Sequence, residues 1–428
     1  MRKQINEIKF DIFLIMTGVL TFLGHIDAIG SFLLPIFVVL WIVMVWKKFD
    51  IEYIISLAFF IGMSINLITE KVDTNIIYLS VFGIVITIDA FFNRRFTKLG
   101  QLFGPLVIFV VLSVLAFFNQ VDLFTTFMGF IEMLAILGAY LYLLNTFKKG
   151  ESTFRNVAKI AVYASLVVTA EMLYYILTSD LDVIVLIRTR AINIGWANIN
   201  LIIYVNLIAI PLVAYLIVNS KFKIVYMMFA LVIILGIFLT LSRSSIFTVG
   251  VYMLILIPTI LILEKNRISL YLQGFVFTII VFMFGYYLQQ DLIVTDYFNT
   301  LLSRDLTDFE SRWDLILVGI DLLKEYPLLG SGGVASSEYH LSEFGSSNYH
   351  NTIVQASTLG VFGILNLGYL FYKKIKLSLK TKDNFKYFAI TMIVVTALVN
   401  GMFQPMYFYI VYMAYVFMVL ASIEVNSE

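Results

Sequence analysis

Long apolar runs fill most of this chain, and short polar or basic segments separate them. A helix needs about 20 mostly apolar residues to cross the hydrocarbon core of a bilayer. By that criterion the pattern predicts an all-α polytopic membrane protein with fourteen spans, or twelve if the first and last pairs are re-entrant, in a single integral membrane domain over residues 1–428. The predicted spans are 10–26, 29–46, 52–69, 74–92, 102–119, 122–146, 157–178, 191–218, 223–241, 245–263, 268–288, 350–372, 385–400 and 404–422.

The lysines and arginines predict which connections face the cytoplasm. Twenty-two of the 29 fall in seven clusters, one at the amino terminus and six after even-numbered spans. Cytoplasmic loops of membrane proteins retain Lys and Arg, whereas outside loops are depleted of them. Both termini are therefore expected in the cytoplasm, with the chain in a bacterial plasma membrane.

Seven basic residues remain in segments that this alternation places outside. They are Lys71, Arg188, Arg190, Arg243, Arg304, Arg312 and Lys324. Five are arginines, whose planar guanidinium can bind two phosphate oxygens at once. Their presence on the disfavoured side indicates an anionic, lipid-anchored ligand there. The alternative is that each binds only the phosphates of surrounding lipids, and it is weakest for Arg243, because so short a turn as 241–245 needs no arginine.

One long polar segment, residues 289–349, is expected to form a large extracytoplasmic loop. Thr307 and Glu310 have the spacing of a capping box, which marks the amino terminus of a helix. Apolar residues then recur at helical spacing: Phe309, Trp313, Ile316, Leu317, Ile320 and Leu323. We predict an amphipathic helix over 308–325 that lies on the outer membrane surface and ends before Pro327.

Three titratable residues on the outer side are candidates for proton transfer. His350 precedes a predicted span, where the helix dipole favours the neutral, proton-accepting imidazole; the alternative is a capping or packing histidine. His340 fits an ordinary loop residue better. Glu171 lies inside a predicted span near its outer end, and such carboxylates face either a cavity or a partner.

Composition excludes several kinds of chemistry. Hydrophobic residues make up 61% and charged residues 13% of the 428 residues, with a net charge of +1, so nucleic acid is not an expected partner. Cysteine is absent, which excludes thiol catalysis, disulfides and zinc–thiolate sites. Asp180 and Asp182 have the spacing of a glycosyltransferase metal motif, but so short a pattern is common by chance. We therefore expect no metal and no cofactor.

A series of short motifs follows one another between residues 185 and 365. They are Asn198 with Asn200, Leu241-Ser-Arg-Ser-Ser245, Arg312-Trp313, Tyr326-Pro-Leu-Leu-Gly-Ser-Gly332, His350-Asn351 and Leu359-Gly-Val-Phe-Gly363. In this order they resemble the O-antigen polymerase and ligase family of membrane glycosyltransferases. Residues 1–180 match that family only as generic spans.

The resemblance implies a GT-C-like membrane glycosyltransferase whose donor is an oligosaccharide on polyprenyl pyrophosphate in the outer leaflet. An acceptor hydroxyl would attack the anomeric carbon, and polyprenyl pyrophosphate would leave without a nucleotide sugar or metal. The resemblance implies that His350 lies near the acceptor. It implies substrate-binding roles for Arg243, Arg312 and either Arg188 or Arg190, and it brings in Asn198 and Asn351 as members of the matching motifs. Glu171, Arg304 and His340 are further candidates because of their predicted position on the outer side.

The function that fits best is a polymerase that joins lipid-linked repeat units into a capsule, exopolysaccharide or O-antigen. The expected partners are the polyprenyl-pyrophosphate-linked oligosaccharide, the bilayer, a chain-length regulator and a flippase. One alternative is a ligase that transfers a finished glycan to another acceptor. Another is a lipid-oligosaccharide flippase, which should carry basic residues along a path through both leaflets.

The predicted topology is testable in this naturally Cys-free chain. A cysteine placed at Ser337 is expected to react with an impermeant thiol reagent added to intact cells or spheroplasts, because 289–349 faces outside. Labelling that requires cell lysis would contradict the topology.

Overall fold

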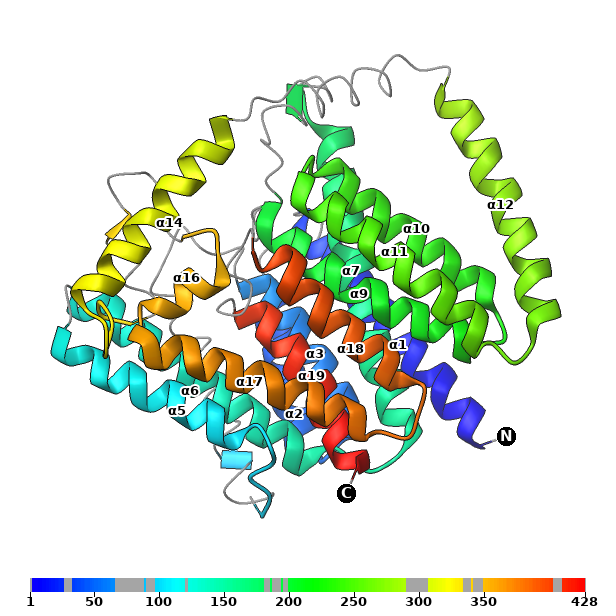
Figure 1. Cartoon of the computed structure of the whole chain (residues 1–428). Helices are drawn as coiled ribbons and strands as arrows, with labels where there is room; N and C mark the ends of the chain where they lie inside the picture. The colour runs from blue at the N-terminus through cyan, green and yellow to red at the C-terminus, as the bar shows by residue number, and fades with distance from the viewer. Residues whose placement is uncertain are drawn as a thin grey trace. The chain divides into compact units, whose positions relative to one another are not determined.

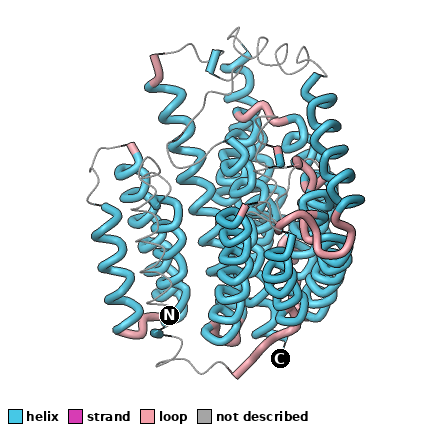
Figure 2. The backbone as a smooth tube through the Cα atoms, turned by 90° about the vertical axis from the view of Figure 1, so that its left-hand side faces the viewer, coloured by secondary structure: helices cyan, strands magenta, loops and turns pink. Residues whose placement is uncertain are grey.

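The computed structural model describes most of the chain as helices (Figures 1 and 2). The described residues are 2–26, 33–65, 88–89, 97–119, 122–180, 185–186, 194, 199–289, 307–333, 340–341, 349–402 and 410–427. Within them, five helical stretches are long and apolar enough to cross a membrane: Glu7–His25, Thr126–Thr146, Glu151–Thr178, Ile202–Asn219 and Arg243–Leu263. This helical architecture is consistent with a membrane protein.

Where the structure describes them, most of the predicted spans overlap a helix, while span 74–92 lies almost wholly outside the described residues. The membrane-length and shorter helices are α1 (Arg2–His25), α2 (Leu33–Trp46), α3 (Ile51–Ile65), α5 (Phe103–Leu115) with the 3₁₀ turn η2 (Ala116–Asn119), α6 (Leu123–Thr146), α7 (Glu151–Thr178), α9 (Ile199–Asn219), α10 (Lys223–Leu239), α11 (Arg243–Leu263), α12 (Arg267–Gln289), α14 (Thr307–Glu325), α16 (Thr352–Ser357), α17 (Gly360–Lys380), α18 (Phe385–Val395) with the π-helical η4 (Thr396–Asn400), and α19 (Ile410–Ser427).

The prediction of one continuous helix over 350–372 was wrong. The structure divides that segment into α16 and α17, and Gly360 at the break has φ +70°, which ends the α-helical path. Helix α17 then continues to Lys380, eight residues past the predicted end. Long lysine side chains can keep their ammonium groups in water while the backbone stays helical, so a basic cluster need not mark a helix end.

The described helices form two compact units, each made of two stretches of the chain. Unit 1 comprises Met1–Arg95 and Thr146–Ser303, and unit 2 comprises Phe96–Asn145 and Arg304–Glu428.

In unit 1, α1 and α7 run in the same direction. Successive contacts join Glu7 to Arg155 (2.8 Å), Asp11 to Lys159 (2.7 Å) and His25 to Glu171 (2.5 Å). The residue numbers rise together along both helices, as alternation predicts for two odd-numbered spans.

A polar network lies in the otherwise apolar core of unit 1. Asn206 on α9 lies 2.5 Å from the Ser165 hydroxyl and donates to the Thr169 hydroxyl at 3.2 Å, both on α7. All three side chains are buried. A β-carbon added at Gly236 on α10 would lie 2.6 Å from Thr169 Oγ1, so the glycine lets the third helix approach this network. Lipid tails are as apolar as the side chains of the helices, so the hydrophobic effect does not drive helices together in a membrane. Hydrogen bonds between polar side chains of this kind help to hold them together.

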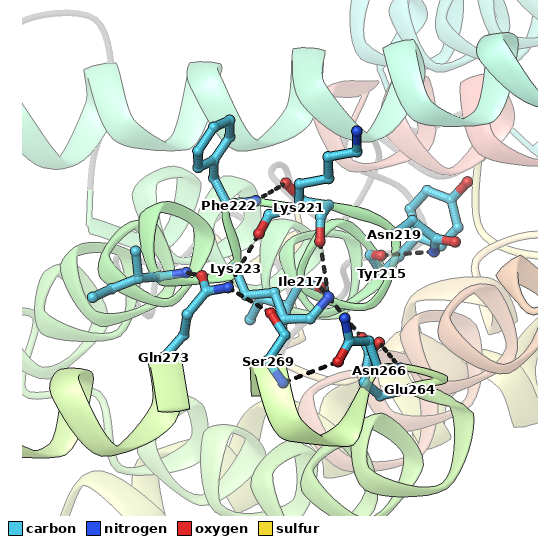
Figure 3. Close-up of polar contacts among 12 residues, drawn as sticks. Tyr215, Ile217, Asn219, Lys221, Phe222, Lys223, Glu264, Asn266, Ser269 and Gln273 are labelled. Carbon is cyan, nitrogen blue, oxygen red and sulfur yellow. Dashed lines mark hydrogen bonds and ion pairs between the residues drawn. The ribbon is translucent and has the colours of Figure 1, made fainter. Parts of the chain in front are cut away.

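Polar contacts join the α9–α10 and α11–α12 connections of unit 1 (Figure 3). Lys223 Nζ lies 2.9 Å from Glu264 Oε2, with both side chains buried, and also donates to the Ser220 carbonyl at 2.8 Å. Gln273 accepts from the Ile224 amide at 2.9 Å. These contacts fix the α9–α10 and α11–α12 connections side by side, so Arg243 lies at the other end of α10 and α11.

Candidate functional site

The turn between α10 and α11 carries Arg243 at the first residue of a 21-residue helix. Leu241 has φ +49°, a left-handed conformation that is unusual for a leucine, and it lies in the three-residue connection 240–242 between α10 and α11. Ser242 follows as the N-cap, and its carbonyl accepts from the Ile246 amide at 2.9 Å. The serine hydroxyls contact one another, with Ser242 Oγ 2.9 Å from Ser245 Oγ.

This turn has the electrostatics of an anion-binding segment. Arg243 is exposed, and the first backbone amides of α11 point out of the helix beside it. The helix macrodipole places partial positive charge at the same end. A guanidinium, a helix amino terminus and neighbouring hydroxyls together favour phosphate-like groups.

His350 lies in unit 2, directly before α16, and its backbone is left-handed with φ +51°. The residues on either side are fixed: Tyr349 is fully buried with its amide 3.3 Å from Gln355 Oε1, and the Thr352 amide donates to the Gly401 carbonyl at 2.9 Å. His350 itself is half-buried. Strained backbone of this kind persists where its surroundings hold it, and it is common at functional sites.

Asn351 has a clear local role as the N-cap of α16. Its Oδ1 accepts from the amides of Ile353 (2.9 Å) and Val354 (3.1 Å), and its Nδ2 donates to the Met402 carbonyl at 3.1 Å. The amide therefore fixes both the start of α16 and the neighbouring turn after η4. Its predicted substrate contact stays a prediction.

Two glycine-bearing segments of unit 2, residues 326–333 and 358–363, are in close backbone contact. Gly330 in the 326–333 turn (φ +75°) meets Thr358, and a β-carbon added there would overlap the Thr358 carbonyl. A β-carbon added at Gly360 would likewise overlap the Leu328 carbonyl. Backbone hydrogen bonds join the segments, with the Val361 amide 2.8 Å from the Pro327 carbonyl. The Pro-Leu-Leu-Gly and Leu-Gly-Val-Phe-Gly motifs are thus two halves of one backbone contact.

Three side chains bind successive carbonyls of the same turn. Asn119 donates to Gly330 (3.1 Å) and Thr126 donates to Gly332 (2.8 Å). His340 Nε2 lies 3.1 Å from the intervening Ser331 carbonyl and donates to it. This contact gives His340 a structural role. No motif in the sequence pointed to Asn119 or Thr126, because they are polar residues at the ends of ordinary apolar helices.

Helix α14 confirms the amphipathic helix predicted over 308–325 and has a second apolar face that the sequence analysis missed. Leu315 packs with Tyr349 and Leu341, and Val318, Leu322 and Val354 border them. Gly319 allows this close approach, since a β-carbon there would overlap Val354. Trp313, Leu317 and Ile320 lie on another face and are exposed. An apolar stripe left uncovered on such a helix fits the predicted position on the membrane surface.

Glu171 is not available as an isolated base. It is buried on α7, and its Oε1 lies 2.5 Å from Nδ1 of the equally buried His25 at the end of α1. An edge-to-face contact between Phe22 and Tyr174 joins the same two helices, with ring centroids 5.8 Å apart. The sequence analysis had missed His25 as the partner of Glu171.

The remaining candidates are described only in part. Arg188, Arg190, Asn198, Arg304 and Asp182 lie outside the described residues. Arg312 belongs to α14, but its side chain is outside them too, and Asp180 is exposed just after α7. The Arg243 turn and His350 belong to different units.

Residues 228–368, about a third of the chain, match a family model described as O-antigen ligase. The match supports a relationship of this region to the O-antigen polymerase and ligase family. The match contains the Arg243 turn, α14, the two glycine-bearing segments and the His350-Asn351 pair, which are the O-antigen family-like motifs that the structure describes. Arg188, Arg190, Asn198 and the His25–Glu171 pair lie outside it. No curated protein and no solved structure matches the chain significantly.

The glycine contact predicts a large effect of one methyl group. Gly360→Ala is expected to destabilise the protein by about 2 kcal/mol or more, because the new β-carbon overlaps Leu328 and φ +70° is unfavourable for alanine. Gly368→Ala on the same helix is the control, since nothing lies within 4 Å of the added carbon. Thermal unfolding in detergent measures both, and equal midpoints would exclude the contact as a stabilising element.

Proposed function

We propose that the protein is a polymerase that joins polyprenyl-pyrophosphate-linked oligosaccharide repeats into a surface polysaccharide. The observation that carries the proposal is the family match over 228–368, which includes both the arginine-bearing turn and the fixed His350. Members of this family are membrane glycosyltransferase-like enzymes that act as polymerases or ligases. In this proposal the growing chain is the donor and a new lipid-linked unit is the acceptor.

Arg243 stabilises the leaving group. When the bond between the anomeric carbon and pyrophosphate breaks, the electron pair stays with the polyprenyl pyrophosphate, whose negative charge increases. A guanidinium fixed at the amino end of α11 meets that charge without reorganising. Arg188, Arg190 and Arg312 are proposed to share the pyrophosphate or glycan with it.

His350 accepts the proton. The acceptor hydroxyl forms the new bond to the anomeric carbon, and its proton passes to the neutral imidazole. A positioned general base of this kind contributes about 10²–10⁴-fold to the rate. The hydrogen bonds of the Tyr349 and Thr352 amides fix the backbone on either side of His350, and a general base requires a defined position.

A ligase is the second candidate, because the matched family is described as O-antigen ligase. A ligase transfers a finished glycan to a different acceptor and does not extend lipid-linked repeats by itself. A flippase is disfavoured, since the basic residues outside the predicted cytoplasmic clusters all fall on the outer side. The proposed location is the bacterial plasma membrane with both termini cytoplasmic, alongside a flippase and a chain-length regulator.

Purified full-length protein incubated with only its lipid-linked repeat unit tests the proposal. A polymerase produces a ladder of products that differ by one repeat. Transfer that occurs only after a second, chemically different acceptor is added would identify a ligase. Absence of transfer in either reaction would argue against a glycosyltransferase.

Arg243→Lys is expected to lower the polymerisation rate by at least about ten-fold, although it keeps the positive charge. The ammonium group cannot reproduce the planar, two-point contact of guanidinium with phosphate oxygens. Arg267→Lys is the matched control, because Arg267 is also the first residue of a helix but lies at the other end of unit 1. Equal rates for the two variants would indicate that Arg243 binds only the phosphates of surrounding lipids.

His350→Asn is expected to lower the rate by about 100-fold or more while the protein remains folded. Asparagine tolerates φ +51°, so this variant removes the base without adding backbone strain. His340→Ala is expected to act mainly on thermal stability, because His340 contacts a backbone carbonyl. A near-normal rate in His350→Asn would mean that another residue is the general base.

A further inference from the structure

Helix α17 leaves one long face uncovered. Gly363, Leu367, Leu370 and Leu377 are buried on the opposite face. The uncovered face carries large apolar side chains spaced three or four residues apart, Phe362, Leu365, Tyr369 and Tyr372, and Leu379 follows seven residues further on. Leu365 is 64% exposed and Tyr372 55% exposed. An uncovered apolar stripe on a helix of a membrane protein is the face that meets lipid chains.

Lysines gather where this stripe ends. Lys373 lies over the Tyr369 ring (5.3 Å to the centroid), and Lys376 lies over the Tyr372 ring (5.6 Å). Lys386 lies over the Tyr387 ring (5.2 Å) at the start of α18, which packs beside α17. With Lys380 and Lys382 they make the lysine corner, and Asp383 is the only acidic residue between 373 and 386.

Within the part of the chain that the structure describes, no carboxylate neutralises the positive charge of the lysine corner. None of its five ammonium groups pairs with a carboxylate among the described residues, whereas in unit 1 Lys148, Arg155, Lys159 and Lys223 each pair with one. An exposed cluster of four or more lysines at the cytoplasmic end of a spanning helix attracts anionic lipid. The rings beneath the lysines suit the boundary between headgroup and hydrocarbon.

We propose that the lysine corner binds the headgroup of an anionic phospholipid in the inner leaflet, with the acyl chains along the α17 stripe. The apolar stripe continues directly into the lysines, which favours a phosphate with chains attached over a free phosphate. The assignment to the inner leaflet rests on the orientation given under the proposed function. The binding itself involves no residue assigned to the glycosyl transfer.

Purified full-length protein in neutral detergent is titrated with phosphatidylglycerol or phosphatidylcholine, and the thermal midpoint is measured. We expect phosphatidylglycerol alone to raise the midpoint. Lys373→Gln/Lys376→Gln/Lys386→Gln should need about ten-fold more of it, since each lysine adds to the attraction. The control Lys221→Gln/Lys265→Gln/Arg267→Gln removes three exposed cations from two other basic clusters, and it should respond like the unchanged protein.

Three results would overturn the proposal. They are an unchanged response in the first triple variant, an equal loss in the control, and an equal rise with glycerol phosphate, which lacks acyl chains. Native mass spectrometry of retained phosphatidylglycerol gives a second readout, and Lys373→Arg/Lys376→Arg/Lys386→Arg should keep the binding. Because no glycan is present, failure here is distinguishable from failure of the proposed polymerase activity.

Discussion

The arrangement around His350 depends on one backbone contact, the mutual approach of Gly330 and Gly360. Neither position leaves room for a β-carbon, and both have left-handed φ angles that glycine adopts without strain. The contact stops α16 after two turns and starts α17 in a new direction. His350 therefore lies directly before a short helix that is held between two turns, and not at the end of a long spanning helix.

Backbone groups in this region are paired in an apolar setting where each unpaired group would be costly. The 330–332 carbonyls accept from Asn119, His340 and Thr126, and the Thr352 amide donates to Gly401. Each partner comes from a different part of unit 2. Loss of any one leaves a buried carbonyl or amide unsatisfied, so these contacts hold the irregular segment together as a group.

The buried charged residues of unit 1 are paired for the same reason as these backbone groups. Removing an ion from water is costly unless a partner and hydrogen bonds replace the water. The buried Lys223 and Glu264 meet each other and nearby loop groups, and His25 and Glu171 pair at the end of α1. Such pairs specify which helix ends lie together. Arg243 is exposed at the opposite end of α10 and α11 from the Lys223 pair.

The sequence by itself determined the helices, because a membrane requires runs of about 20 apolar residues and such runs are visible without a structure. It also predicted the α10–α11 turn and the apolar stripe of α14. Only the tertiary structure decided that 350–372 is broken, that α14 has a second buried face and that Glu171 meets His25. Those features depend on contacts between residues distant in the chain, where a missing β-carbon or a facing side chain sets the outcome. The hydrophobic periodicity of a sequence does not indicate which distant residues will be in contact.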